Sequence, residues 1–246
     1  MFSFFTKKTF LSDHLAHLVD MHNHILPGID DGAKNVAASL DLIQGMGSLG
    51  ITDFICTPHI MANYYPNDAQ SIGTAHRQLE AGLKEAGITG VRLRVAAEHM
   101  IDAHFEQLLE EDRIMTMDGQ YILVEMSYLQ PSLNLLDAIA SCTEKKHYPI
   151  LAHPERYVFL HGKMNTYREY KDKGMLMQMN LLSLSDHYGK EVHKAAVALL
   201  EAGLIDFVAS DIHHTGHLEK LKEIKLTDQL LQKVLPIIER TSYNFQ

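Results

Sequence analysis

The sequence contains little cysteine and no long hydrophobic run, and both absences exclude classes of protein. Two cysteines, Cys56 and Cys142, among 246 residues exclude a disulfide scaffold and favour a reducing compartment. A secretory signal needs about 7–15 successive apolar residues and a spanning helix about 20, and neither occurs. The aromatic patch in residues 1–10 is broken by Lys7 and Lys8, and it predicts either a short surface helix or a self-association contact. We expect a cytoplasmic protein without membrane insertion.

Basic residues are also few. Lys and Arg number 22 against 31 Asp and Glu, so the formal net charge is −9, and no basic run is present. Such an acidic chain is a poor general ligand for nucleic acid or for membrane surfaces. Histidine, by contrast, is abundant, with 16 residues, and its side chain titrates near neutral pH and binds metal ions.

Short apolar segments alternate with longer amphipathic segments along the chain. The predicted strands span residues 18–22, 52–57, 91–97, 121–125, 148–152, 175–180 and 207–210. The predicted helices span residues 34–49, 68–87, 101–110, 132–146, 163–173, 188–202 and 228–240. Several helices are followed by a glycine, the usual left-handed stop, namely Gly50, Gly87, Gly174 and Gly203. Seven strand–helix repeats without a linker predict a single-domain α/β barrel.

The polar residues best suited to chemistry follow the ends of the predicted strands. These residues are His22, His24, His59, Glu98, Glu125, His153, Asp211 and His213. The carboxyl ends of barrel strands face one mouth, where the active sites of such folds are built. We therefore expect these side chains to converge there, although they are distant in sequence.

Two pairs of these residues are spaced two apart. His22 and His24 stand at the end of the first predicted strand, and Asp211 and His213 follow the last one. Side chains at this spacing point to the same face of a strand, where two of them can bind one divalent ion. Two ordinary polar histidines are the alternative for the first pair.

Several carboxylates stand beside apolar runs or in tight turns. In the turn 25–32 we expect either Asp30 or Asp31 to cap a helix before Ala33 and the other to bind metal. Glu98 and Glu125 end buried runs, where a bare charge is costly, so each must ligate a metal or pair with Arg or Lys. The mix of imidazole and carboxylate suits Zn, Mn or Fe better than metals that demand thiolate.

Five motifs in order, DMHNHILPGIDDGA, TPH, AAEHMID, HPERY and ASDIH, resemble those of the polymerase and histidinol phosphatase (PHP) superfamily. Within it, the chain resembles the bacterial tyrosine-protein phosphatases of capsule and exopolysaccharide loci, from about residue 18 to residue 215. The resemblance implies a distorted (β/α)7 TIM-like barrel with three metal ions. It also implies a PHP metallophosphatase domain at residues 18–246 behind an N-terminal extension at residues 1–17.

The resemblance assigns ligands to three divalent metal ions, with Mn favoured and Fe, Zn or Mg as alternatives. The ligands form three groups: His22, His24, Glu98 and Asp211 for the first ion; Glu98 as a bridge, with Glu125 and His153, for the second; and Asp31, His59 and His213 for the third.

A basic residue next to these groups matches the phosphate-binding arginine of the family. This residue is Arg156 in HPERY, for which a surface or core ion pair, with Glu155 as one candidate partner, is the alternative. The family's second basic contact is missing, because the stretch around Gly216 contains no arginine, so His217 or Lys220 would have to replace it. The positive charge of three divalent ions and Arg156 exceeds the negative charge of the four carboxylates. The site would therefore be positively charged, which suits a phosphate.

The resemblance implies hydrolysis of phosphotyrosine, with catalytic roles for Arg156 and Asp211. A hydroxide between the first two ions would attack phosphorus in line, because metal binding lowers the pKa of water toward about 7. The implied substrate is the phosphotyrosine tail of a bacterial tyrosine kinase that controls polysaccharide export. Residues 61–66 and 157–161 are candidates for the rim that receives the tyrosine, with loop packing as the alternative. The sequence leaves the oligomeric state open.

Other functions fit less well. A cysteine phosphatase needs Cys-x5-Arg, and the sixth residues after Cys56 and Cys142 are Ala62 and Tyr148. A histidinol-phosphate phosphatase has the same kind of site and is the main enzymatic alternative. A metal-dependent deaminase or amidohydrolase would lack ILPGIDDG and HPERY. A non-catalytic binding protein on the same fold would be favoured by a missing ligand, and none is missing.

Overall fold

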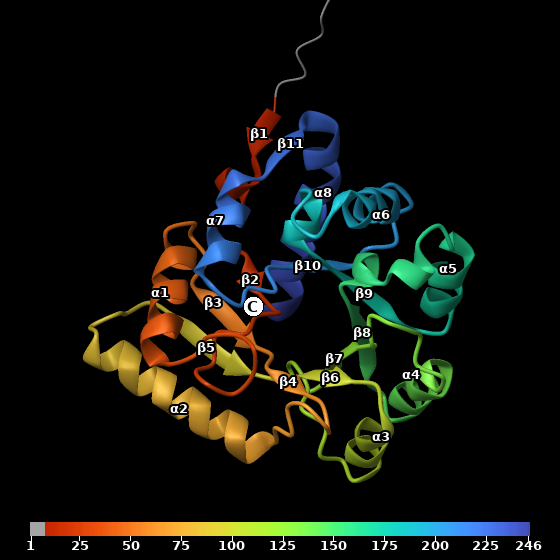
Figure 1. Ribbon diagram of the computed structural model, residues 1–246, viewed down its shortest axis with the longest axis horizontal. Helices are drawn as coiled ribbons and strands as arrows, with labels where there is room; N and C mark the ends of the chain where they lie inside the picture. Colours follow the sequence, from red (N-terminus) through yellow and green to blue (C-terminus); the bar gives the residue numbers. More distant parts are fainter. Residues whose placement is uncertain (1–7) are drawn as a thin grey trace, which may run out of the picture.

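Parallel strands form the middle of the molecule, and the helices surround them (Figure 1). The computed structural model describes residues 8–246. The central strands lie in two sheets, of order β2-β3-β5 and β10-β9-β8-β7-β6-β4. Their bounds are β2 (Val19–Asp20), β3 (Asp53–Cys56), β4 (His59–Ile60), β5 (Arg92–Val95), β6 (Glu98–Met100), β7 (Tyr121–Glu125), β8 (Tyr148–Ala152), β9 (Leu176–Asn180) and β10 (Phe207–Ala209).

The two sheets are parts of one barrel. Strand β4 continues the line of β3 beyond Pro58, which cannot donate to the ladder, and β6 continues β5 after residues 96–97. The backbone N–H of Glu98 donates to the carbonyl of Pro58 at 3.1 Å. A parallel bridge between Asn23 and Ile212 joins the first strand to the last. Seven strand lines therefore close into the distorted α/β barrel that the sequence predicts.

Each predicted helical segment contains a helix, and one further helix follows β10. The bounds are α1 (Val36–Gly47), α2 (Ala69–Glu85), α3 (Ala103–Glu110), α4 (Leu135–Glu144), α5 (Met164–Asp172), α6 (Lys190–Glu201), α7 (Thr215–Glu223) and α8 (Asp228–Phe245). Gly50, Gly87, Gly174 and Gly203 all have positive φ angles, which confirms their role as helix stops. Helix α7 escapes prediction because its short sequence buries only Leu218 and Leu221.

Apolar side chains fill two regions, one between strands and helices and one inside the barrel. The inner region is closed at the amino ends of the strands by Phe245 of α8, which is fully buried. Its ring lies 5.1 Å from the rings of both Tyr121 and Phe207, the first residues of β7 and β10. The apolar filling therefore occupies the floor of the barrel and leaves the carboxyl end for polar side chains.

Residues 8–15, which precede the barrel, pack onto its body, and the first three of them form part of a small ribbon. Strand β1 (Lys8–Phe10) pairs antiparallel with β11 (Lys225–Thr227), and this ribbon projects at one end of the molecule (Figure 1). The predicted surface helix is thus wrong for residues 8–10, and the rest of the aromatic patch lies outside the described residues. Leu11 and Leu15 beside the ribbon are buried. Over residues 8–246, no helix is long and apolar enough to cross a membrane.

Candidate metal centre and active site

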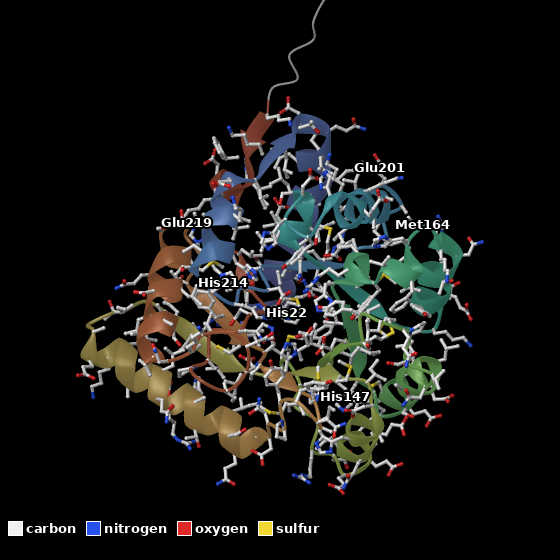
Figure 2. All side chains as sticks on the ribbon, viewed as in Figure 1. His22, His147, Met164, Glu201, His214 and Glu219 are labelled. Atoms are coloured by element: carbon white, nitrogen blue, oxygen red, sulfur yellow. The ribbon has the colours of Figure 1, made fainter. Side chains whose placement is uncertain are left out.

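The nine predicted ligands all gather at the carboxyl end of the barrel. They form four overlapping groups, and within each group one candidate ligand atom from every residue lies within 4.8 Å of the others. The label of His22 falls near the centre of the molecule, whereas those of Met164 and Glu201 fall on the outer helices (Figure 2). His153 and Asp211 adopt left-handed backbone angles, with φ of 37° and 51°, which turn these side chains at the points where their strands end.

The first predicted set is joined by five short separations, although its members fall into two of these groups, Glu98 standing with His22 and not with Asp211. Its atoms are Nε2 of His22, Nε2 of His24, Oε2 of Glu98 and Oδ1 of Asp211, and five of their separations are 3.3–3.4 Å. Two ligands of one tetrahedral ion, bound at about 2.1 Å, lie about 3.4 Å apart. All four residues are buried, so the spacing and donor types fit a divalent ion.

Buried polar atoms without hydrogen bonds mark a second part of the cluster. Nδ1 of His59 lies 3.1 Å from Oε2 of Glu98 and 2.8 Å from Oε1 of Glu125. None of these three atoms has a hydrogen-bond partner, although an unpaired buried polar atom is costly. Burial and the nearby charge of Glu98 raise the pKa of Glu125. A cation placed here would satisfy all three atoms.

The grouping of the remaining ligands differs in part from the expected one. Glu125 joins His59 and Glu98, whereas His153 joins His22 and Glu98, so the predicted second set is not one group. The predicted third set is gathered. The Oδ1 atom of Asp31 lies 3.5 Å from Nε2 of both His59 and His213.

Among residues 8–246, no lysine or arginine forms an ion pair with Glu98 or Glu125, so the alternative of an Arg or Lys ion pair is wrong for them within the described part of the chain. Glu98 is surrounded by His22, His24, His59 and His153, at 2.9–3.4 Å. Burial would raise the pKa of Glu98, but the charges of His22 and His59 hold it well below its usual range. The carboxylate is therefore kept ionised, as a metal ligand must be.

The two aspartates in the turn after His24 make different contacts. Asp30 accepts hydrogen bonds from the backbone of Gly32 (2.9 Å) and His59 (3.2 Å) and contacts Nδ1 of His24 at 2.8 Å. Asp31 faces the cluster. Helix capping by either aspartate is wrong, because α1 begins later, at Val36, with Asn35 as its cap.

Arg156 lies at the edge of the cluster between two tyrosine rings. Its guanidinium carbon is 4.6 Å from the ring centre of Tyr128 and 4.4 Å from that of Tyr188. Its Nη1 donates to Oδ2 of Asp211 at 2.9 Å. The ion pair named as the alternative is therefore present, but its partner is Asp211 and not Glu155. The Glu155 carboxylate accepts from Ser183 at 2.7 Å, and burial raises its pKa to about 7.

A cavity of about 640 Å³ opens over the cluster. Arg156, Glu98 and Glu125 line its base, and its other lining residues include Tyr64, Tyr65, Tyr128 and Leu129. Segment 61–66 therefore contributes to the rim as predicted. Segment 157–161 does not, because Tyr157 is buried and its hydroxyl accepts from the backbone of Met126.

The two candidates for a second phosphate contact lie in different places. His217 shares a cavity of about 310 Å³ with Arg156, Tyr188 and His214. Lys220 instead donates to Glu223 at 2.8 Å and lines a separate cavity with His187. The structure thus brings His217, but not Lys220, next to Arg156.

Four polar residues near the cluster are absent from the sequence prediction. They are Tyr128, Tyr188, Gln178 and Asn180. The first two lie in loops, where spacing carries no signal. The two amides occupy alternate positions of the buried strand β9, and polar residues alternating in a buried strand are the signal that could have found them.

A closed parallel barrel whose carboxyl end gathers imidazoles and carboxylates has the arrangement of a metal-binding barrel of the PHP fold. The model of the family "Capsular polysaccharide synthesis, CpsB/CapC" matches residues 18–233, and the chain belongs to this family.

Named relatives agree with this assignment. The chain is 30% identical over 198 residues to the tyrosine-protein phosphatase YwqE of Bacillus subtilis, covering 80% of this chain and 78% of that protein. It is 27% identical over 203 residues to the tyrosine-protein phosphatase CpsB of Streptococcus pneumoniae, covering 80% and 83%.

Solved structures show the same fold. One, from work on YwqE of Bacillus subtilis and CpsB of Streptococcus pneumoniae, described as unique metal-dependent tyrosine phosphatases, matches with a TM-score of 0.78 and 27% identity over 93% of this chain and 91% of that chain. Histidinol phosphate phosphatase from Lactococcus lactis matches with a TM-score of 0.55 and 13% identity, over 92% and 94%, a likeness of fold alone.

Proposed function

We propose that this chain is a metal-dependent protein-tyrosine phosphatase. The observation that carries the proposal is the arrangement at the barrel mouth, where nine potential ligands gather, seven of them line one cavity, and Arg156 lines the same cavity. Family membership and the names of the relatives support the same activity. The cluster takes three divalent ions, with manganese as the favoured metal and Fe, Zn or Mg as alternatives.

The proposed metal ligands and Arg156 would have different roles in the reaction. Bound divalent ions would supply a nucleophilic water at neutral pH and neutralise charge on the phosphoryl oxygens. Arg156 offers a planar set of donors that matches two phosphate oxygens, and its contact with Asp211 and the two tyrosine rings fixes its orientation. Preformed donors of this kind stabilise the charge that develops in the transition state.

The cavity supports an aryl phosphate as the substrate. Tyr64 and Tyr65 stand at the rim, and the ring of Tyr65 stacks on His59 with an interplanar angle of 14°. These rings provide flat apolar walls for a phenyl group. Phenolate is a tolerable leaving group, because the pKa of tyrosine is about 10, so the reaction needs no strong general acid.

The substrate we propose is a phosphotyrosine tail of a bacterial tyrosine kinase that regulates capsular or exopolysaccharide synthesis. Membership of a capsular polysaccharide synthesis family supports this partner. We place the reaction in the cytoplasm, since two buried free thiols suit a reducing compartment. We further propose residues 18–246 as the catalytic domain and residues 1–17 as an N-terminal extension, of which residues 8–15 pack onto that domain.

The test compares three substrates on one metal-loaded preparation: a phosphotyrosine peptide, the matching phosphoserine peptide and histidinol phosphate. We expect kcat/KM to be highest for phosphotyrosine. We also expect a chelator to abolish turnover and manganese to restore it. Preference for histidinol phosphate would favour the alternative phosphatase, and full activity of rigorously metal-free protein would refute the metal site.

A further inference from the structure

Strand β9 differs from the other six strand lines of the barrel, because no proposed metal ligand lies on it or within two residues of its end. Met177 and Met179 belong to the outer core, whereas Gln178 and Asn180 occupy the alternate positions and are fully buried. Two amides in such a place are costly unless they are hydrogen-bonded. Their contacts therefore show what these residues are for.

The two amides form a chain that joins opposite sides of the first ligand group. Oε1 of Gln178 lies 2.7 Å from Nδ1 of His22, and Nε2 of Gln178 donates to Oδ1 of Asn180 at 3.0 Å. Nδ2 of Asn180 donates to Oδ2 of Asp211 at 2.5 Å. The chain thus connects residues 22 and 211 through the interior of the barrel.

The Asp211 carboxylate, at one end of this row of hydrogen bonds, fixes the direction of each of them. An ionised carboxylate only accepts, so Asn180 must turn its NH₂ group to Asp211 and its oxygen to Gln178. Gln178 then donates to Asn180 and turns its own oxygen to His22. Nδ1 of His22 must therefore carry a proton, and in the neutral ring Nε2 keeps its lone pair.

The chain also contacts only the rear atom of each proposed ligand. On Asp211 it holds Oδ2, which also accepts from Arg156 at 2.9 Å. On His22 it holds Nδ1. The front atoms, Oδ1 of Asp211 and Nε2 of His22, are left facing each other at 3.3 Å, one of the five short separations in the first group.

We propose that Gln178 and Asn180 are positioning residues that preset two ligands of the first metal site, by fixing the His22 tautomer and by reserving one oxygen of Asp211 for the ion. This inference rests on the proposed metal-dependent function. Partners behind metal ligands typically contribute about 10- to 100-fold to metal affinity. A purely structural pair of amides would contribute to melting temperature and leave metal affinity unchanged.

Two variants test the proposal in the full chain. Gln178→Leu removes the acceptor for His22 at similar volume. Gln178→Glu keeps an acceptor but cannot donate to Asn180, so the amide of Asn180 loses its partner or turns its oxygen toward Asp211. Gln232→Glu, at an exposed position on α8, is the matched control for the added charge.

The first readout is stepwise zinc affinity, measured by competition with a chromophoric chelator. We expect one zinc ion to bind about 10- to 100-fold more weakly in both Gln178 variants, while the other ions and the Gln232→Glu protein keep wild-type affinities. The second readout is the ring ¹⁵N–¹H spectrum of the zinc-loaded protein. The wild type should show a slowly exchanging Nδ1–H signal from His22, and Gln178→Leu should lose that protection.

Wild-type zinc affinities in both Gln178 variants, together with a retained protected His22 signal, would overturn the positioning role while leaving the proposed phosphatase intact. A lower melting temperature with unchanged zinc affinity would do the same. A wild-type protein that binds no divalent ion would overturn the proposed function as well as this inference. Because Gln178→Glu is isosteric, it keeps the test decisive if Gln178→Leu fails to fold.

Discussion

The first and third ligand groups lie side by side but are built differently. In the first group every residue is buried, His22 is held from behind by Gln178, and His24 by Asp30. In the third group the side chain of Asp31 is 50% exposed and stands 3.5 Å from His213. The first group is thus preorganised to bind an ion. The third group is open to water and would hold an ion less tightly. We expect the third ion to be the one that exchanges readily.

Removing a ligand of the buried group should have the largest effect. His22→Ala should lower kcat/KM roughly 10³-fold or more, because a metal ion supplies several kcal/mol of transition-state stabilisation. Bound metal, measured by mass spectrometry, should fall with activity. His147→Ala, at a histidine whose label falls away from that of His22 (Figure 2), should retain both. Normal turnover in His22→Ala would show that the first group is not the catalytic metal site.

Arg156→Ala should have the next largest effect. A contact that strengthens in the transition state contributes about 2–4 kcal/mol, or roughly 30- to 1,000-fold in kcat/KM. Metal content should stay at the wild-type level, because Arg156 is not one of the proposed metal ligands. Arg156→Lys should recover part of the loss, because lysine is only a point charge.

Melting temperature must be measured on the same preparations of the Arg156 variants. The control is Arg168→Ala, at an exposed position on α5. A merely structural role for Arg156 would appear as a lower melting temperature with near-normal turnover. That result would remove this residue from the mechanism.

Asp31→Ala should have a smaller, metal-dependent effect. An exposed charge contributes on the order of 1 kcal/mol, so we expect roughly five- to tenfold weaker binding of one ion. Excess manganese should restore the activity of Asp31→Ala and leave His22→Ala inactive. Titrating both variants with manganese compares the two groups directly. Equal rescue of both variants would contradict the difference between the buried and the exposed group.

Replacing the cysteines should have the smallest effect on turnover. Cys56 and Cys142 are both buried, and burial raises the pKa of each thiol, so neither serves as a nucleophile. Cys56→Ser and Cys142→Ser should keep wild-type kcat/KM. Cys56→Ser should still unfold about 1–3 kcal/mol more easily, because it buries a hydroxyl. A large loss of turnover in a folded, metal-loaded variant would point to thiol chemistry.

Periodicity and strand-end positions predict most of the fold and the gathering of the ligands. The seven strand segments alternate with helices in the order expected, since buried strands and amphipathic helices leave patterns within short windows. The sequence does not predict that one strand line divides into β3 and β4 and another into β5 and β6. The first division depends on where Pro58 falls in the ladder. Helix α7 has too few apolar residues to be recognised.

The finer chemistry of the site depends on contacts between distant residues, which local patterns do not contain. The roles of Asp30 and Asp31 follow from which of them reaches His24. The rings of Tyr128 and Tyr188 meet Arg156 from two separate loops. Such pairings arise only after the chain has folded.

The buried ring of Phe245 has a consequence for how the protein is made. This residue closes the floor of the barrel, and the first ligand group needs both His22 and Asp211. A growing chain therefore cannot complete the first ligand group before Asp211 has been synthesised, nor close the floor before Phe245 follows, since contacts of such long range form late. Incomplete polypeptides of this enzyme would neither hold the first ion nor dephosphorylate a partner while still attached to the ribosome.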